Sequence, residues 1–283
     1  MNKIKSILFR NRIDFNGERF DPDTVHLEWW KNKDNVGDYL STVIFEWMTK
    51  DIDLSRPIRK GLHLSTVGSL LGGRYYDATV WGSGILDLLA VRSINLKSRL
   101  VKYDVRAVRG PLTKEVLQNA GYDCTDIALG DPAILMPLIY RSPQKEKVYD
   151  RCIINHYINS DKNYSFPDSV CISAGTTDYR SFIDTIMASR MVISSSLHGV
   201  ILAEAYGVPA IYCCENLQKM LFKVYDYYFS TGRYNVIIAN SVDEALRMQP
   251  MNLPDFSEMR KNLIEAFPKD LWEDNKISQK PGK

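Results

Sequence analysis

Residues 191–214 read MVISSSLHGVILAEAYGVPAIYCC, and they contain a complete βαβ unit in one continuous stretch. The apolar, β-branched run at 191–194 predicts a short strand. Residues 197–206 predict a helix, because Gly207 supplies a C-terminal stop and a proline follows it. The apolar run 210–214 then predicts a second strand. Two strands joined by a helix pair in parallel, so this stretch indicates an α/β fold.

The turn inside this unit carries Ser194, Ser195 and Ser196, and His198 lies in the first turn of the helix. Open parallel sheets bind ligands at the carboxyl ends of their strands, which is where this turn is expected. Three hydroxyl groups, the free N–H groups and the positive end of the helix together favour an anion. An alternative stays open, in which the serines only cap the helix and His198 is a partly buried packing residue.

The composition is that of an ordinary globular protein. A chain of 283 residues fits two domains of roughly 100–150 residues each. A net charge of +2 argues against a dedicated nucleic-acid binder. The five cysteines are odd in number and lack CxxC spacing, so they predict neither a disulfide framework nor a zinc site. The sequence contains no leader-like segment and no long apolar run, and we therefore expect a cytoplasmic protein without a transmembrane segment.

The rest of the chain alternates strand and helix patterns, which predicts parallel sheets. Besides the opening unit, we expect strands at 5–10, 26–30, 63–67, 78–81, 100–108, 148–155, 169–173 and 234–239. We expect further helices at 36–48, 112–120, 179–190, 217–229, 242–248 and 256–267. The charged, proline-containing stretch 142–147 predicts a linker. The predicted domains are therefore 1–141 and 148–249, followed by a helical tail, 250–283, that packs back on the body.

Polar residues follow several of the predicted strands. Asn35, Gly37 and Asp38 form a turn after the aromatic strand 26–30, and Asp38 falls in the first turn of the next helix. Asp38 either complements the helix dipole or faces a ligand, and we favour the ligand because other strands end in the same way. Asp131 precedes a proline in a turn, and His156 ends the strand 148–155.

Two further strand ends carry glycines and an arginine. Gly82, Ser83 and Gly84 follow the strand 78–81, where glycine allows positive φ or close approach of the backbone to a ligand. This short pattern lacks the third glycine of a dinucleotide fingerprint. Arg109 follows the strand 100–108, and its guanidinium suits a carboxylate or phosphate through two parallel hydrogen bonds. The alternative for Arg109 is a surface arginine paired with a nearby acid.

Taken together, these pieces resemble the polysaccharide pyruvyl transferases, in particular the branch similar to bacterial exopolysaccharide ketal-pyruvate transferases. The motifs occur in the family's order within residues 26–233. They are Asn35-Val-Gly-Asp38, Val80-Trp-Gly-Ser-Gly-Ile85, Val108-Arg-Gly-Pro-Leu-Thr113, Leu129-Gly-Asp-Pro-Ala133, Asn155-His156-Tyr157, Ser194-Ser-Ser-Leu-His-Gly199 and Asp226-Tyr-Tyr228.

The resemblance implies two Rossmann-like domains that face one another across a cleft, the arrangement called GT-B. It also implies transfer of a pyruvyl group from phosphoenolpyruvate to a sugar, with release of phosphate. The acceptor implied is a hexose such as galactose with a neighbouring diol, either free or lipid-linked. No cofactor or metal is expected besides the donor substrate. Acceptor identity, oligomeric state and peripheral membrane contact are not specified by the sequence.

By the same resemblance, Arg109 corresponds to the arginine of the VRG segment and His198 to the histidine of the SxLHG segment. Some relatives have glutamate at the position of Tyr39, and some have arginine at the position of Ser196. Ser196 carries no charge, so another cation must take the place of that arginine.

Phosphoenolpyruvate carries a carboxylate and a phosphate and reacts when its methylene carbon is protonated, so its site needs cations, N–H donors and a proton donor. We predict three catalytic residues, His198, Arg109 and Asp38, with Asp38 or Asp131 accepting the proton of the sugar hydroxyl. The residues predicted to bind substrate are Asn35, Gly37, Gly82, Ser83, Gly84, Asp131, His156, Ser194, Ser195 and Ser196. Two alternatives remain: a GT-B glycosyltransferase that uses a nucleotide sugar, and a sugar-binding protein without catalysis.

Overall fold

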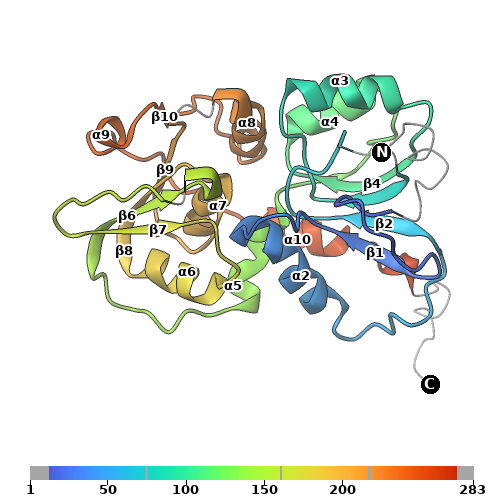
Figure 1. Cartoon of the computed structure of the whole chain (residues 1–283), viewed down its shortest axis with the longest axis horizontal. Helices are drawn as coiled ribbons and strands as arrows, with labels where there is room; N and C mark the ends of the chain where they lie inside the picture. Colours follow the sequence, from blue (N-terminus) through green and yellow to red (C-terminus); the bar gives the residue numbers. More distant parts are fainter. Residues whose placement is uncertain (1–12, 74–75, 160, 216–217, 273–283) are drawn as a thin grey trace.

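The computed structural model describes residues 13–73, 76–159, 161–215 and 218–272, and it contains two five-stranded sheets. All strand pairs in both sheets are parallel, as the βαβ pattern predicts. The first sheet has the order β1-β2-β3-β4-β5 (Figure 1). Its strands are β1 (Val25–Glu28), β2 (Leu62–Ser65), β3 (Ala78–Trp81), β4 (Tyr103–Val108) and β5 (Ala128–Leu129).

The second sheet has the order β10-β9-β8-β6-β7, so the chain moves to opposite sides of β6. Its strands are β6 (Tyr149–Asn155), β7 (Ser169–Ser173), β8 (Ser189–Ser194), β9 (Ala210–Cys213) and β10 (Ile238–Ala239). The strand order reverses between β6 and β8, where Ile154 pairs with Ser194. Such a switch point opens a crevice at the carboxyl ends of the two strands. The serine turn therefore lies at the place where this kind of sheet binds ligands.

Helices connect the strands. They are α2 (Val36–Thr49), α3 (Leu88–Lys97), α4 (Pro111–Asn119), α5 (Met136–Ile139), α6 (Tyr179–Met187), α7 (Leu197–Ala205), α8 (Leu221–Ser230), α9 (Val242–Ala245) and α10 (Ser257–Glu265). All but α3 and α5 correspond to helices that the sequence predicts. The described residues also contain four short 3₁₀ helices, which are η2 (Pro132–Leu135), η3 (Tyr157–Asn159), η4 (Gln218–Met220) and η5 (Lys269–Leu271). None of the helices within the described residues is long and apolar enough to cross a lipid bilayer.

A few predicted boundaries are wrong. The helix expected at 179–190 ends at Met187, because Ser189 already pairs with Tyr149 and begins β8. The strand expected at 234–239 shrinks to the two residues of β10. Helix α3 was not predicted, since its apolar residues do not follow a single period. The strand expected at 5–10 and residue 217 of the predicted helix 217–229 lie outside the described residues.

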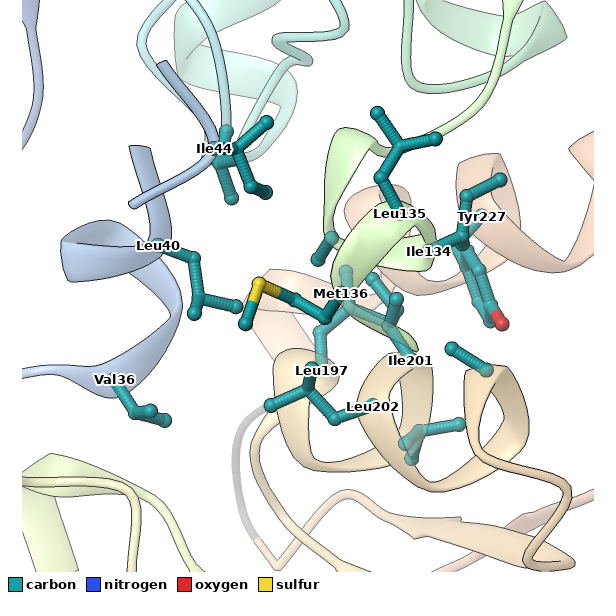
Figure 2. Close-up of a cluster of buried hydrophobic side chains, with 14 of the residues drawn as sticks. Val36, Leu40, Ile44, Ile134, Leu135, Met136, Leu197, Ile201, Leu202 and Tyr227 are labelled. Carbon is teal, nitrogen blue, oxygen red and sulfur yellow. The ribbon is translucent and has the colours of Figure 1, made fainter. Parts of the chain in front are cut away.

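The two halves of the chain share one apolar core. Val36, Leu40 and Ile44 lie on one face of α2, and all three are fully buried. Figure 2 shows them facing Met136 and Leu197, which belong to α5 and α7. The α2 backbone also reaches the second half, because Val36 N donates to Ala174 O at 2.9 Å. Burial of this common surface fixes the two sheets relative to one another.

The C-terminal helix α10 packs back on the first half, as the sequence predicts. It contacts β5 and η2, and the indole of the buried Trp81 donates to Leu263 O at 2.8 Å. Trp81 also packs edge-on against Phe267. The stretch 141–148 that precedes β6 contains no regular helix or strand. The domain limits 1–141, 148–249 and 250–283 stay a prediction.

Candidate active site

A pocket lies at the carboxyl ends of the strands of both sheets, with a cavity of about 190 Å³. It collects the turns that follow β1, β2, β4, β6 and β8, together with the start of α8. The lining residues are Phe15, Trp30, Asn35, Asp38, Gly68, Ser69, Leu70, Leu86, Arg109, His156, Tyr157, Ser196, Leu197, His198, Met220 and Lys223. Residues from both halves of the chain thus form one site.

The turn after β1 places Asp38 in the pocket. Asn35 is the N-cap of α2 and accepts from Gly37 N at 3.1 Å through its side chain. The amide of Asn35 also donates to Asp38 Oδ2 at 2.7 Å, which orients that carboxylate. Burial raises the pKa of Asp38 to about 6, against the opposing effects of His198 and Lys223. Asp38 is therefore a carboxyl group that changes charge close to neutral pH.

His198 lies between the two halves, on the first turn of α7. Its Nε2 is 3.5 Å from Asp131 Oδ2, and that oxygen has no hydrogen-bond partner among the described residues. The ring packs directly on the backbone of α2, since a Cβ at Gly37 would lie 1.8 Å from His198 Nδ1. Gly37 thus provides the space for the histidine, and Asp131 provides a carboxylate beside its ring.

Arg109 is 1% exposed and is held on every side. Its NH1 donates to Ser69 Oγ at 2.8 Å, and its NH2 donates to Ile85 O at 2.6 Å. Its Nε lies 3.2 Å from Asp226 Oδ2. Gly84 leaves room for the guanidinium, because a Cβ there would lie 2.4 Å from Arg109 Cζ. Each terminal nitrogen of Arg109 has one N–H group beyond those bonds that can reach a ligand.

Asp226 of α8 also fixes the start of α4 in the other half. Its two oxygens accept from Thr113 N at 2.9 Å and from Thr113 Oγ1 at 2.6 Å. The N-cap of α4 is Gly110, which has no side chain to offer, so Asp226 supplies the cap from a distance of 113 positions in the sequence. Gly110 is tightly packed there, since its Cβ would lie 1.9 Å from Asp226 O.

Lys223 is a pocket residue that the sequence interpretation missed. It precedes Asp226 by three positions on α8, so the two side chains lie on the same face of the helix. Burial and, to a smaller extent, the charge of Arg109 lower the pKa of Lys223 to about 8, while Asp38 opposes the shift. Lys223 is still mainly protonated at pH 7. Lys223 is therefore a second cation beside Arg109 in the pocket lining.

Hydrogen bonds between serine side chains and backbone groups fix the conformation of the serine turn. Ser194 Oγ donates to Ser196 O at 2.8 Å and accepts from Ser196 N at 3.0 Å. Ser195 Oγ accepts from His156 N at 2.9 Å. Ser196 is the N-cap of α7, yet its side chain makes no capping hydrogen bond in the described part of the chain. The interpretation that these serines only cap the helix does not describe the turn, and Ser196 is among the residues that line the pocket.

His156 lies next to the serine turn, at the end of β6. Burial lowers the pKa of His156 to about 3, and the nearby charge of Lys223 acts in the same direction. The imidazole is therefore neutral near pH 7, and its Nδ1 accepts from Ile158 N at 3.3 Å. A neutral ring can exchange hydrogen bonds with a ligand but adds no charge to the pocket.

Six of the residues predicted from the sequence line the pocket: Asn35, Asp38, Arg109, His156, Ser196 and His198. The other predicted residues surround these six. Gly37 and Gly84 contact His198 and Arg109, and Asp131 faces His198. Ser194 and Ser195 shape the turn. The roles of all these residues in substrate binding stay predictions.

Gly82 and Ser83 lie behind the pocket rather than in its lining. Gly82 has φ +88°, and a Cβ there would lie 2.2 Å from Pro132 Cγ. Ser83 Oγ donates to Gly68 O at 3.1 Å and accepts from Leu70 N at 3.3 Å. These two residues join the turns that follow β2 and β3. Within the described residues, no group of three histidine, cysteine, aspartate or glutamate side chains could hold a metal ion.

Fold and site together define an α/β protein with a pocket between two parallel sheets, lined by Arg109, Lys223, Asp38 and His198. The family model "Polysaccharide pyruvyl transferase" matches residues 37–216. The chain belongs to this family.

Individual relatives are distant. An uncharacterized mimivirus protein, L143 of Acanthamoeba polyphaga mimivirus, is 28% identical over 177 residues, which cover 58% of each chain. The succinoglycan biosynthesis protein ExoV of Rhizobium meliloti is 27% identical over 114 residues, 38% of this chain and 34% of ExoV. The chain thus spans 58% of the length of the first of these curated relatives and 34% of the second.

A solved structure shares the fold. The crystal structure of a functionally uncharacterized protein from Klebsiella pneumoniae matches with a TM-score of 0.50 and 15% identity. The match covers 85% of this chain and 100% of that one.

Proposed function

We propose that this protein transfers a pyruvyl group from phosphoenolpyruvate to a sugar of a bacterial surface polysaccharide or its precursor, forming a pyruvate ketal. The observation that carries the proposal is the pairing of two cations, Arg109 and Lys223, with the start of α7 in one small pocket. His198 lies in the same pocket with a carboxylate beside it. This combination suits a donor that carries two anionic groups and must be protonated to react.

Each of the two cations binds one anionic group of the donor. Arg109 is rigidly held, and its two remaining N–H groups bind the planar carboxylate. Lys223, the N–H groups at the start of α7 and the Ser196 hydroxyl bind the phosphate. In this arrangement Lys223 replaces the arginine that some relatives have at the position of Ser196.

The reaction then needs a proton on the methylene carbon and the removal of the protons of two sugar hydroxyls. His198 protonates the methylene carbon of phosphoenolpyruvate, which makes the adjacent carbon electrophilic. A sugar hydroxyl attacks that carbon and gives its proton to Asp38 or Asp131. A second hydroxyl of the same sugar forms the other C–O bond as the bond to phosphate breaks. The second hydroxyl gives its proton to the departing phosphate, and the aspartic acid returns the first hydroxyl proton to His198. Overall, one diol proton replaces the proton placed on the new methyl group and the other ends on phosphate, so the products are a pyruvate ketal and inorganic phosphate.

The size of the cavity supports a small donor. About 190 Å³ is below the roughly 300–1,000 Å³ of pockets that enclose drug-sized ligands. A nucleotide sugar is larger than phosphoenolpyruvate and needs a pocket of that larger class. The position of the pocket between the two sheets also supports the GT-B arrangement for this chain.

The test is phosphoenolpyruvate-dependent phosphate release with a panel of galactosides. We expect release by the wild type and its loss in His198→Ala and Arg109→Ala, while Arg190→Ala retains it because Arg190 is exposed and far from the pocket lining. Binding of phosphoenolpyruvate and of uridine and guanosine diphosphate sugars is measured in parallel. Binding of a nucleotide sugar alone would identify a glycosyltransferase, and sugar binding without turnover of any donor would identify a non-catalytic protein.

A further inference from the structure

Helix α3 exposes large apolar side chains to solvent. Leu88, Leu89 and Leu96 are 69%, 71% and 80% exposed, values that are far from those of core residues. The helix is anchored by its opposite face, where Ile94 is buried in the core. Scattered exposed leucines are common. Three on one helix of ten residues form an apolar patch, and such patches mark interaction sites.

The exposed face of α3 is also basic. Arg92 lies between Leu88 and Leu96 at a spacing of four residues on each side, so all three share one face. Arg92 is exposed, and so are Arg99 and Lys102, which follow the end of α3 at Lys97. The sequence from Leu88 to Lys102 contains no aspartate or glutamate. Lys97 points inward and donates to Gly72 O at 2.9 Å, so it does not belong to this face.

The α3 face is adjacent to the pocket. Leu86 lines the pocket, and α3 begins two residues later, after its N-cap Asp87. In Figure 1, α3 lies along the same edge of the molecule as α8, the helix that carries Lys223. Whatever binds the α3 face is therefore brought close to the rim of the pocket.

We propose that the α3 face docks on the surface of an anionic lipid bilayer. Exposed leucines can insert among lipid headgroups, and Arg92 between Leu88 and Leu96 can meet an anionic headgroup at the same surface. Anionic headgroups neutralise Arg92, Arg99 and Lys102, and each such contact strengthens binding.

A second copy of the chain fits the α3 face less well. A twofold dimer would place the same patch on both sides of the interface. The arginines would then meet like charges, and no acid on this stretch would offset the repulsion. Charge complementarity therefore favours an anionic bilayer over self-association.

The consequence for catalysis rests on the proposed function. A bilayer against α3 holds the pocket rim at the membrane surface, where the sugar of a lipid-linked acceptor is presented. A soluble acceptor does not need this contact. The α3 face thus selects between acceptors by location and leaves the pocket chemistry unchanged.

The experiment is co-sedimentation with phosphatidylcholine vesicles that contain or lack phosphatidylglycerol. We expect binding only to the anionic vesicles, and we expect it to weaken with added salt. The double variant Leu88→Ser/Leu89→Ser should lose binding. Arg92→Glu should weaken it by more than about fivefold, the effect of one cation near an anionic surface. Leu138→Ser on α5, where Leu138 is 48% exposed, is the matched control and should bind like the wild type.

The substituted side chains are exposed, so the thermal midpoint and phosphoenolpyruvate binding should stay unchanged in every variant. Equal binding by wild type and α3 variants, or no binding to anionic vesicles, would overturn the proposal. A wild-type dimer in light scattering that Leu88→Ser/Leu89→Ser dissociates would also overturn it, in favour of self-association. Vesicle binding needs neither donor nor acceptor, so its outcome is independent of whether the proposed transfer occurs.

Discussion

Replacing Asp226 with alanine is expected to destabilise the protein and to weaken donor binding at the same time. The carboxylate is fully buried and holds both Arg109 and the start of α4. Its removal leaves Arg109, itself 1% exposed, as a buried cation without its carboxylate partner. Breaking a buried ion pair from one side costs about 3–5 kcal/mol in free energy of unfolding. For a chain of this size, that corresponds to a fall of roughly 6–20 °C in thermal midpoint.

Urea unfolding and calorimetric titration with phosphoenolpyruvate measure the two effects. We expect the dissociation constant to rise by about tenfold or more, equivalent to about 1.4 kcal/mol, because Arg109 loses its fixed orientation. Asp226→Asn keeps the size of the side chain but not its charge, and it should fall between the wild type and Asp226→Ala in both measurements. Glu115→Ala, which removes an exposed acid from α4, is the matched control.

A loss of less than about 1 kcal/mol in the free energy of unfolding of Asp226→Ala, which is the range of exposed ion pairs, would contradict the predicted destabilisation. The reasoning also fails if stability falls while donor affinity stays at the wild-type value. That result would mean that Asp226 supports the packing of α8 on α4 without orienting Arg109.

Three further predictions concern the pocket. Gly84→Ala should reduce donor affinity, since its Cβ would lie 2.4 Å from Arg109 Cζ; titration with phosphoenolpyruvate checks this, and wild-type affinity would contradict it. Asp38→Asn should abolish turnover but raise the free energy of unfolding above pH 6. A buried acid with a pKa of about 6 lowers the stability of the fold when it is ionised, by at most about 3 kcal/mol. The gain should vanish towards pH 4 in unfolding experiments, and a gain that does not depend on pH would contradict this assignment. Donor affinity should fall as pH rises through about 8, where Lys223 loses its proton. Lys223→Arg should remove this inflection, because arginine stays charged. If the dependence of donor affinity on pH is the same in Lys223→Arg as in the wild type, Lys223 is excluded as the titrating cation.

Much of the fold could be predicted from the sequence because its signals are local. The βαβ unit at 191–214 is recovered as β8, α7 and β9. Apolar period and the positions of glycine and proline place most strands and helices within a few residues. The parallel arrangement also predicts polar turns at the carboxyl ends of the strands, and Asn35, Asp38, Arg109, His156 and His198 from such turns line a common pocket.

Other features were decided only by the tertiary structure. Nothing near Lys223 in the sequence identifies it as a pocket residue, and the partners of Asp226 lie more than a hundred positions away. The shared core of α2 and α7 and the exposed face of α3 likewise depend on which surfaces of different segments meet. The spacing of apolar residues and the turn residues between them are local properties of the chain, so the sequence alone determined the order of most strands and helices. Burial, ion pairing and shifted pKa values arise from contacts between distant segments, and for that reason only the folded chain determined which charges share the pocket.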